Sequence, residues 1–223
     1  RPKERLPWGI PLPFDQNYVT YVWFDALINY ISIYGSLDDI KKTGFWPANH
    51  HLLGKDILTT HAVYWSTMLK AIGLKPALNL FAHGWWTVNG QKMSKSRGTF
   101  IKARTYLDHL NPEYLRYYFA AKLGPGVGDI DLNPNDFKQR VNADVIGKLV
   151  NIASRCSSFI HKNFDSKLTS VFAKNGKNVF EQAANKSDDI KNYYENRRYS
   201  EAVRAIMGLA DITNQVIDAH KPW

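Results

Sequence analysis

The chain has 223 residues, 44% of them hydrophobic, and it contains no run of about 18 apolar residues that would predict a membrane-spanning helix. Its single cysteine, Cys156, can form neither an internal disulfide nor a zinc site by itself, which fits a reducing compartment. Together these features lead us to expect a cytoplasmic protein with no protein-bound metal and no membrane contact. The net charge of +9 favours a polyanionic partner such as nucleic acid, with a merely solvated basic surface as the equal alternative.

The first half of the sequence predicts alternating strands and helices. The run VTYVWF, Val19 to Phe24, is apolar and β-branched, which is typical of a strand covered on both faces, and Asp25 is placed to cap a following helix. HHLLG, His50 to Gly54, predicts another buried strand. Asp56 would begin the next helix, and residues 78–83 a third strand. This order predicts a parallel sheet with helices on its faces.

The stretch GQKMSKSRGTF, Gly90 to Phe100, places three cations on a short segment of small residues. The Asn-Gly pair at 89–90 predicts a two-residue hairpin turn, so this segment leaves one arm of a hairpin. Lys92, Lys95 and Arg97 are suited to a triphosphate, because cations that arrive as pyrophosphate departs stabilise the transition state selectively. The alternative is a solvated basic loop.

The second half of the sequence is helical. After a glycine-rich break, Asn133 and Pro134 supply an N-cap and a first helical position, and the helix continues to about Phe164. Further helices are expected over Val179 to Arg197 and Ser200 to His220, and three helices predict an all-α bundle. The apolar stripes of the first and last helices consist of Val141, Val145, Leu149, Ile152, Cys156 and Phe159, and of Val203, Ile206, Leu209, Ile212 and Val216.

The order of residues in KMSKS resembles the signature of class I aminoacyl-tRNA synthetases. Its setting, FAHGWWTVNGQKMSKSRGTF, is similar to the methionyl-tRNA synthetases among them. So are YVWFDALINYIS, HLLGKDILTTHAVYW, LRYYFAAKL, DIDLNPNDFKQRVNADVIGKLVNIASR and DAHKPW, which together cover nearly the whole chain. The resemblance implies ATP-dependent activation of methionine, with Mg²⁺ accompanying ATP, and transfer to tRNA(Met), including the initiator tRNA.

The resemblance also implies three parts. Residues 1–100 would be the C-terminal half of a Rossmann-type catalytic domain carrying the KMSKS loop, residues 101–132 a stem-contact and linker region, and residues 133–223 an α-helical anticodon-binding domain. The fold class expected is therefore a partial Rossmann-like parallel sheet followed by an all-α helix bundle.

An ATP site is implied at two stretches of the chain. Lys92 and Lys95 would be the catalytic residues that hold the phosphates. Asp56 lies where a strand gives way to a helix, so its carboxylate would accept hydrogen bonds from the ribose hydroxyls, or would act only as an N-cap. The other ATP-binding residues implied are Gly54, Ile57, Trp86, Met93, Ser94 and Ser96.

A methionine side-chain pocket is implied at four aromatic residues. His61 and Trp65 are four apart on one predicted helix, and with Trp23 and Tyr30 they resemble the family's pocket. Aromatic rings give a thioether polarizable walls, which suits methionine. We expect His61 to supply shape and a hydrogen bond rather than to carry protons. Without the resemblance, these residues would be interpreted as core aromatics.

Recognition of a CAU anticodon is implied at the helical end of the chain. Asn151 and Arg155 are four apart, on a flank shared with Lys148 and Lys162, so amide and guanidinium would contact base edges while the lysines hold phosphates. Trp223 would stack on an unpaired base. The alternative for the asparagine and the arginine is a solvated helix face.

The family's His-x-Gly-His element does not occur in this sequence. We therefore expect the chain to be the C-terminal half of the catalytic domain joined to the anticodon-binding domain, and to be inactive by itself. Two alternatives remain open. One is a class I synthetase for another amino acid such as cysteine, leucine or valine. The other is a module that only binds tRNA.

Overall fold

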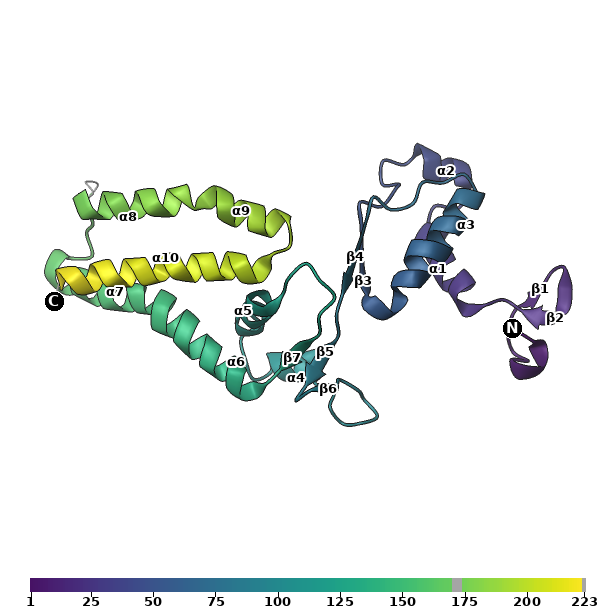
Figure 1. The fold of residues 1–223 in the computed structure, drawn as a ribbon, viewed down its shortest axis with the longest axis horizontal. Helices are drawn as coiled ribbons and strands as arrows, with labels where there is room; N and C mark the ends of the chain where they lie inside the picture. The colour runs from purple at the N-terminus through teal and green to yellow at the C-terminus, as the bar shows by residue number, and fades with distance from the viewer. Residues whose placement is uncertain (170–173, 222–223) are drawn as a thin grey trace. The chain divides into compact units, whose positions relative to one another are not determined.

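The computed structural model describes residues 1–169 and 174–221 (Figure 1). Contacts divide the chain into two compact units, Arg1–His83 and Gly84–Trp223. Among the described residues, no helix combines the length and the apolar character needed to cross a bilayer.

The first unit contains two small sheets and several helical segments. Its elements are η1 (Lys3–Arg5), β1 (Pro11–Leu12), β2 (Asp15–Val19), α1 (Val22–Ser32), α2 (Leu37–Lys42), β3 (His50–Gly54), η2 (Lys55–Ile57), η3 (Thr60–Trp65), α3 (Ser66–Ala71) and β4 (Asn79–His83). Strands β1 and β2 are antiparallel. Strands β3 and β4 are parallel, in register from His50 opposite Asn79 to Gly54 opposite His83. The strands predicted over His50 to Gly54 and over residues 78–83 are thus confirmed, as is their parallel pairing.

The strand predicted over Val19 to Phe24 is wrong. Only Val19 belongs to a strand, and α1 begins at Val22, so Asp25 lies inside this helix rather than capping it. The helix forms because Trp23, Leu27 and Ile31 recur every four residues and pack on one core, with Leu27 only 1% exposed. This periodicity outweighs the β-propensity of the apolar run.

The core of the first unit lies where α1, α2, η3 and α3 meet. Its buried members are Leu27, Ile40, Trp65, Leu69 and Leu74. Segment η3 is a π-helix, with a wider turn than the α-helix expected there. It continues into α3, and Gly73, at φ +75°, follows the end of this helix. The crossover from β3 to β4 is therefore helical, as predicted.

The second unit joins a three-stranded sheet to a series of helices (Figure 1). Its elements are β5 (Trp86–Val88), β6 (Gln91–Lys92), α4 (Ala103–Leu107), α5 (Pro112–Lys122), β7 (Ile130–Leu132), α6 (Pro134–Arg140), η4 (Val141–Val150), α7 (Asn151–Phe164), α8 (Lys174–Asn185), α9 (Ser187–Glu195) and α10 (Tyr199–His220). The predicted hairpin is confirmed: β5 and β6 are antiparallel. Strand β7 pairs with β5 in parallel.

The long helix predicted from Asn133 to Phe164 is confirmed as α6, η4 and α7, although its middle segment is a π-helix. The Asn133 side chain caps it by accepting hydrogen bonds from the amides of Asn135 and Asp136. The helix predicted over residues 179–197 is two helices, α8 and α9, separated at Lys186.

Helix α10 packs against α5, η4, α7, α8 and α9, and Figure 1 shows it running beside α8 and α9. Its most buried residues are Ala202, Met207 and Ala210, whereas the predicted stripe is only partly buried. Small side chains let the neighbouring helices approach closely. In the earlier helix Val141 is buried as expected, but Leu149 is 49% exposed, because the π-helical turn shifts the positions that share a face.

Candidate functional site

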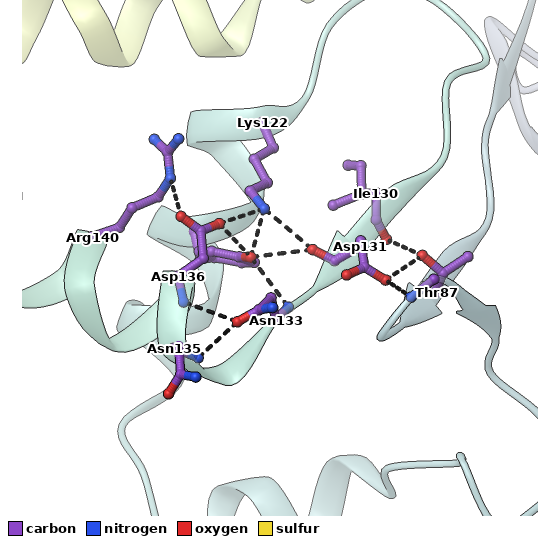
Figure 2. Close-up of polar contacts among 10 residues, drawn as sticks. Thr87, Lys122, Ile130, Asp131, Asn133, Asn135, Asp136 and Arg140 are labelled. Carbon is purple, nitrogen blue, oxygen red and sulfur yellow. Dashed lines mark hydrogen bonds and ion pairs between the residues drawn. The ribbon is translucent and has the colours of Figure 1, made fainter.

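The hairpin before the KMSKS loop is tightly fixed. Asn89 and Gly90 have φ of +51° and +73°, the left-handed conformation that a two-residue hairpin turn requires. Asp131 on β7 accepts two hydrogen bonds of 2.7 Å at Oδ1, one from the Thr87 hydroxyl and one from the Gly90 amide. Figure 2 shows the contact between Asp131 and Thr87. The Gly90 amide, and next the Thr87 hydroxyl, lower the pKa of Asp131.

The KMSKS loop is closed upon itself by Thr99. The Thr99 hydroxyl accepts from the Ser94 amide at 3.0 Å and donates to the Lys92 carbonyl at 3.2 Å. The hydroxyls of Ser94 and Ser96 are hydrogen-bonded at 3.0 Å, and Gly98 takes a φ of +71°. The sequence analysis did not identify Thr99. Its only signal was a hydroxyl side chain five residues after Ser94.

The loop presents its cations to solvent. Lys92, Lys95 and Arg97 are all exposed. The Lys92 ammonium lies over the ring of Trp85, and the Lys95 ammonium lies 5.3 Å from the ring centre of Phe100. Among the described residues, neither lysine forms an ion pair. Their charges are thus available to an anion.

Met93 and Trp86 join the loop to the sheet. The Met93 amide donates to the Trp86 carbonyl at 3.3 Å, so this carbonyl already has one partner. The Trp86 ring packs edge-on against Phe119, with ring centres 4.6 Å apart, and its indole nitrogen is buried without a hydrogen bond. The side chain therefore serves packing, and only its backbone is suited to contact a base.

A partly buried polar network joins β7 to α5 and α6 (Figure 2). The hydroxyl of Tyr118, a fully buried residue, accepts from the Lys122 ammonium at 2.6 Å and donates to the Asp136 carboxylate at 2.9 Å. Lys122 also lies 2.6 Å from Asp136 and donates to the Asp131 carbonyl at 3.2 Å. The Lys122 ammonium lowers the pKa of Asp136. Burial lowers the pKa of Lys122, but Asp136 and Tyr118 outweigh it and raise that pKa.

In the first unit, Gly54, Asp56 and Ile57 lie at the end of β3. A Cβ at Gly54 would come 2.7 Å from Oδ1 of Asp56, so a larger residue at this position would displace the Asp56 carboxylate. Asp56 is exposed and caps neither η2 nor η3, so its interpretation as an N-cap is wrong and its carboxylate faces solvent. The Ile57 carbonyl accepts from the Thr60 hydroxyl at 2.6 Å, which holds this turn in place.

The four aromatic residues predicted to line a pocket lie together. His61, 2% exposed, donates from Nδ1 to the Ile57 carbonyl at 2.9 Å, and its Nε2 is hydrogen-bonded to the Tyr30 hydroxyl at 3.0 Å. The ring centres of Tyr30 and Trp65 are 5.8 Å apart, and those of Trp23 and His61 are 6.0 Å apart. The polar groups of Tyr30 and His61 are thus fixed in direction, as a binding wall requires.

Asn151 and Arg155 face α10 and are not simply solvated. Arg155 Nη2 donates to Asp218 Oδ1 at 2.5 Å, and Asn151 Nδ2 donates to Asn214 Oδ1 at 3.4 Å. One turn earlier, Lys148 donates to Asp211 at 2.8 Å, whereas Lys162 is exposed. Trp223 lies outside the described residues.

Comparison with known proteins finds consistent relatives. The family model for tRNA synthetases class I (M) matches residues 3–157. The methionine–tRNA ligase of Dichelobacter nodosus (strain VCS1703A) is 45% identical over 225 residues, covering 97% of this chain and 33% of the relative. The chain thus spans about a third of the length of this curated relative.

Solved structures agree with these relatives. Mycobacterium tuberculosis methionyl-tRNA synthetase in complex with methionyl-adenylate has a TM-score of 0.82 at 29% identity, covering 97% of this chain and 43% of that chain. The apo form of the same enzyme has a TM-score of 0.77 at 26% identity, covering 97% and 42%. These matches make the parallel strands and their helices part of a Rossmann-like fold.

Proposed function

Because this chain belongs to the class I tRNA synthetases (M), we propose that it is part of a methionine–tRNA ligase. The complete protein activates methionine with ATP to methionyl-adenylate and transfers the methionyl group to tRNA(Met), including the initiator tRNA. The chain corresponds to the C-terminal half of the catalytic domain and the anticodon-binding region, and is inactive alone. We place the protein in the cytoplasm.

Activation is an in-line displacement. A carboxylate oxygen of methionine bonds to the α-phosphorus of ATP, the bond from that phosphorus to its bridging oxygen breaks, and pyrophosphate leaves with Mg²⁺. The terminal ribose hydroxyl of tRNA then attacks the adenylate carbonyl, and AMP leaves. Positioning and electrostatic stabilisation account for the rate, and no side chain need act as a nucleophile.

The observation that carries the proposal is the state of the KMSKS loop. Lys92 and Lys95 are exposed and, within the described part of the chain, unpaired with any carboxylate. In our proposal they are the catalytic residues that stabilise the departing pyrophosphate. The loop closed by Thr99 is short enough to move as one body toward the phosphates. Met93, Ser94 and Ser96 complete the loop's contacts with ATP.

The rest of the ATP site lies, in our proposal, at the end of β3 and on β5. Asp56 is exposed and caps no neighbouring helix, so its carboxylate is available to accept hydrogen bonds from the ribose hydroxyls. Gly54 permits close approach of the backbone, Ile57 lies against adenine, and backbone groups of Trp86 contact the base edge.

We assign the methionine side chain to Trp23, Tyr30, His61 and Trp65. Supporting this, the Tyr30 hydroxyl and His61 are held by hydrogen bonds while their rings remain in contact with Trp65 and Trp23. Rings arranged this way give a flexible thioether polarizable contacts worth about 0.3–1.5 kcal/mol each. His61 supplies shape and a hydrogen bond in this role.

For tRNA, residues 101–132 are proposed to contact the stem and residues 133–223, a helix bundle, to bind the CAU anticodon. The pairs that Asn151 and Arg155 make with α10 hold both side chains at the helix surface before RNA arrives. Trp223 is assigned a stacking role on an unpaired base. The net charge of +9 supports binding to RNA phosphates.

The test is ATP–pyrophosphate exchange by the complete gene product. Methionine should support exchange at least about a hundredfold faster than cysteine, leucine or valine at equal concentration. Faster exchange with any of those three would assign the protein to another synthetase. No exchange with any amino acid, together with salt-dependent binding of a CAU stem-loop, would leave only the tRNA-binding module.

A further inference from the structure

His51 is a buried residue of β3 that lies against the four aromatic residues. The strand alternates exposed and buried positions, and His51 and Leu53 occupy the buried side. The side chain of His51 is only 7% exposed. Its ring centre lies 4.7 Å from that of Tyr30 and 5.8 Å from that of His61. His51 therefore contacts two residues of the proposed methionine site.

The Nε2 atom of His51 is buried without a hydrogen bond. A buried polar atom without a partner costs free energy, and native proteins keep few of them, commonly for a functional reason. Two indole nitrogens nearby, those of Trp46 and Trp65, share this state. Three unpaired nitrogens therefore surround one aromatic cluster.

The polar groups next to His51 are hydrogen-bonded to other partners. The Tyr30 hydroxyl is hydrogen-bonded to His61 Nε2, and His61 Nδ1 donates to the Ile57 carbonyl. Burial, and next the neighbouring His61, lower the pKa of His51, so its ring is neutral at pH 7. A neutral imidazole has one N–H donor and one acceptor nitrogen, so Nε2 can form one neutral hydrogen bond rather than an ion pair.

We propose that His51 is a further binding residue of the methionine site, with its Nε2 completing its hydrogen bonding on the bound amino acid. This inference rests on the proposed function. It assigns His51 a role that the four aromatic residues do not fill, because their polar atoms are committed to one another or are indole donors. Methionine brings polar atoms with which the His51 Nε2 can form a hydrogen bond.

The experiment compares variants of the complete gene product in ATP–pyrophosphate exchange. His51→Phe keeps an aromatic ring and removes Nε2, so the methionine KM should rise about three- to tenfold, the usual effect of losing one neutral hydrogen bond. The ATP KM should stay within about twofold. His51→Gln returns an amide near the place of Nε2 and should bring the methionine KM back toward the wild-type value.

His50 supplies the matched control. It is the exposed neighbour on the same strand, with its ring against Phe81, so His50→Phe makes the same chemical change on the opposite face. His50→Phe should leave the methionine KM unchanged. In the absence of methionine, the Tm of the His51→Phe protein should equal or exceed that of the wild type, because an unsatisfied polar atom has been removed.

The outcomes separate this inference from the proposed function. An inactive wild type would contradict the function itself. An active wild type with an unchanged methionine KM in His51→Phe, or with equal increases in His51→Phe and His50→Phe, would overturn the role of His51 alone. If His51→Phe fails to fold, His51→Leu is measured in its place, and a wild-type KM there is equally decisive.

Discussion

Arg155 and Asp218 are paired across two helices, with Nη2 and Oδ1 2.5 Å apart, although 63 residues separate them in the sequence. Asn151 pairs with Asn214 across the same separation. The two side chains proposed to contact an anticodon are thus held against α10 by partners of their own. The Asp218 side chain is 61% exposed, so the pair is open to solvent and to RNA.

Replacing Arg155 should affect RNA binding more than folding. Arg155→Ala removes a guanidinium able to contact a base edge, so binding of a CAU stem-loop should weaken about tenfold or more. The Arg155 side chain is 25% exposed and that of Asp218 is 61% exposed, so solvent screens the ion pair in part and the free energy of unfolding should fall by about 1 kcal/mol. Filter binding and chemical denaturation measure the two effects.

Lys162 gives the control for this variant. It is exposed on the same helix, so Lys162→Ala should weaken CAU and non-cognate stem-loops equally and reduce the salt dependence of both. An Arg155→Ala protein that loses affinity for every anticodon to the same extent would contradict base recognition.

Removing the second lysine of the KMSKS loop should slow activation. Lys95→Ala takes away a cation that we propose stabilises the departing pyrophosphate, so the rate of adenylate formation should fall about a hundredfold. Methionine affinity should change by less than about threefold. Rapid-quench measurement on the complete gene product tests this. Lys102→Ala, which removes an exposed lysine after the loop, should keep the wild-type rate, and an equal loss there would implicate general charge only.

Thr99 should matter through its hydroxyl. Thr99→Ala breaks the hydrogen bonds to the Ser94 amide and the Lys92 carbonyl, so the loop becomes less ordered and adenylate formation should slow about three- to tenfold. Thr99→Ser keeps the hydroxyl and should retain most of the rate. If the alanine and serine variants were equally slow, the methyl group rather than the hydrogen bonds would be responsible.

Asp131 should give the second unit an acid-sensitive contribution to stability. The pKa of Asp131 is lowered in the folded state, so the folded protein binds its proton less readily than the unfolded chain. The ordinary pKa is about 3.9, so this contribution is complete above about pH 5 and is lost as the pH falls through the lowered value. Asp131→Asn should lower Tm by about 2–4 °C at pH 7, and this difference should shrink in acid. A difference independent of pH would contradict the charge-based explanation.

Replacing Gly54 should affect ATP binding through the neighbouring carboxylate of Asp56. In Gly54→Ala the new Cβ would meet Asp56 Oδ1 at 2.7 Å, which forces the carboxylate to move. If Asp56 binds ribose, the ATP KM should rise about tenfold while the methionine KM stays near wild type. Gly44→Ala, where no atom lies within 4 Å of the added Cβ, should have no effect on either.

Local patterns predicted much of the fold. The strand His50–Gly54 and the turn at Asn89 and Gly90 follow from short-range rules, and so does the cap at Asn133. The run from Val19 to Phe24 misled because its β-branched residues overlap a helical repeat that continues beyond it, through Leu27 and Ile31. The π-helical turns left no trace in the spacing of apolar residues.

One local motif was enough to single out Lys92 and Lys95, whose role stays a prediction; the structure shows that both are exposed. The supporting contacts were not predictable, because they join residues distant in sequence: Asp131 reaches Gly90, and His51 meets Tyr30. Such pairings depend on how strands and helices assemble, and no single segment encodes them. Thr99 is the exception, a local contact hidden among ordinary loop residues.

The bond from Asp131 to Gly90 has a practical consequence for dividing the protein. An expression fragment that stops at residue 100 would keep β5 and β6 but lose β7, their parallel neighbour, together with the carboxylate that secures the turn. The KMSKS loop would then be attached to a hairpin of two short strands, which is rarely stable in water. A fragment beginning at Gly84 and extending through α10 keeps that loop together with β7 and the rest of the second unit.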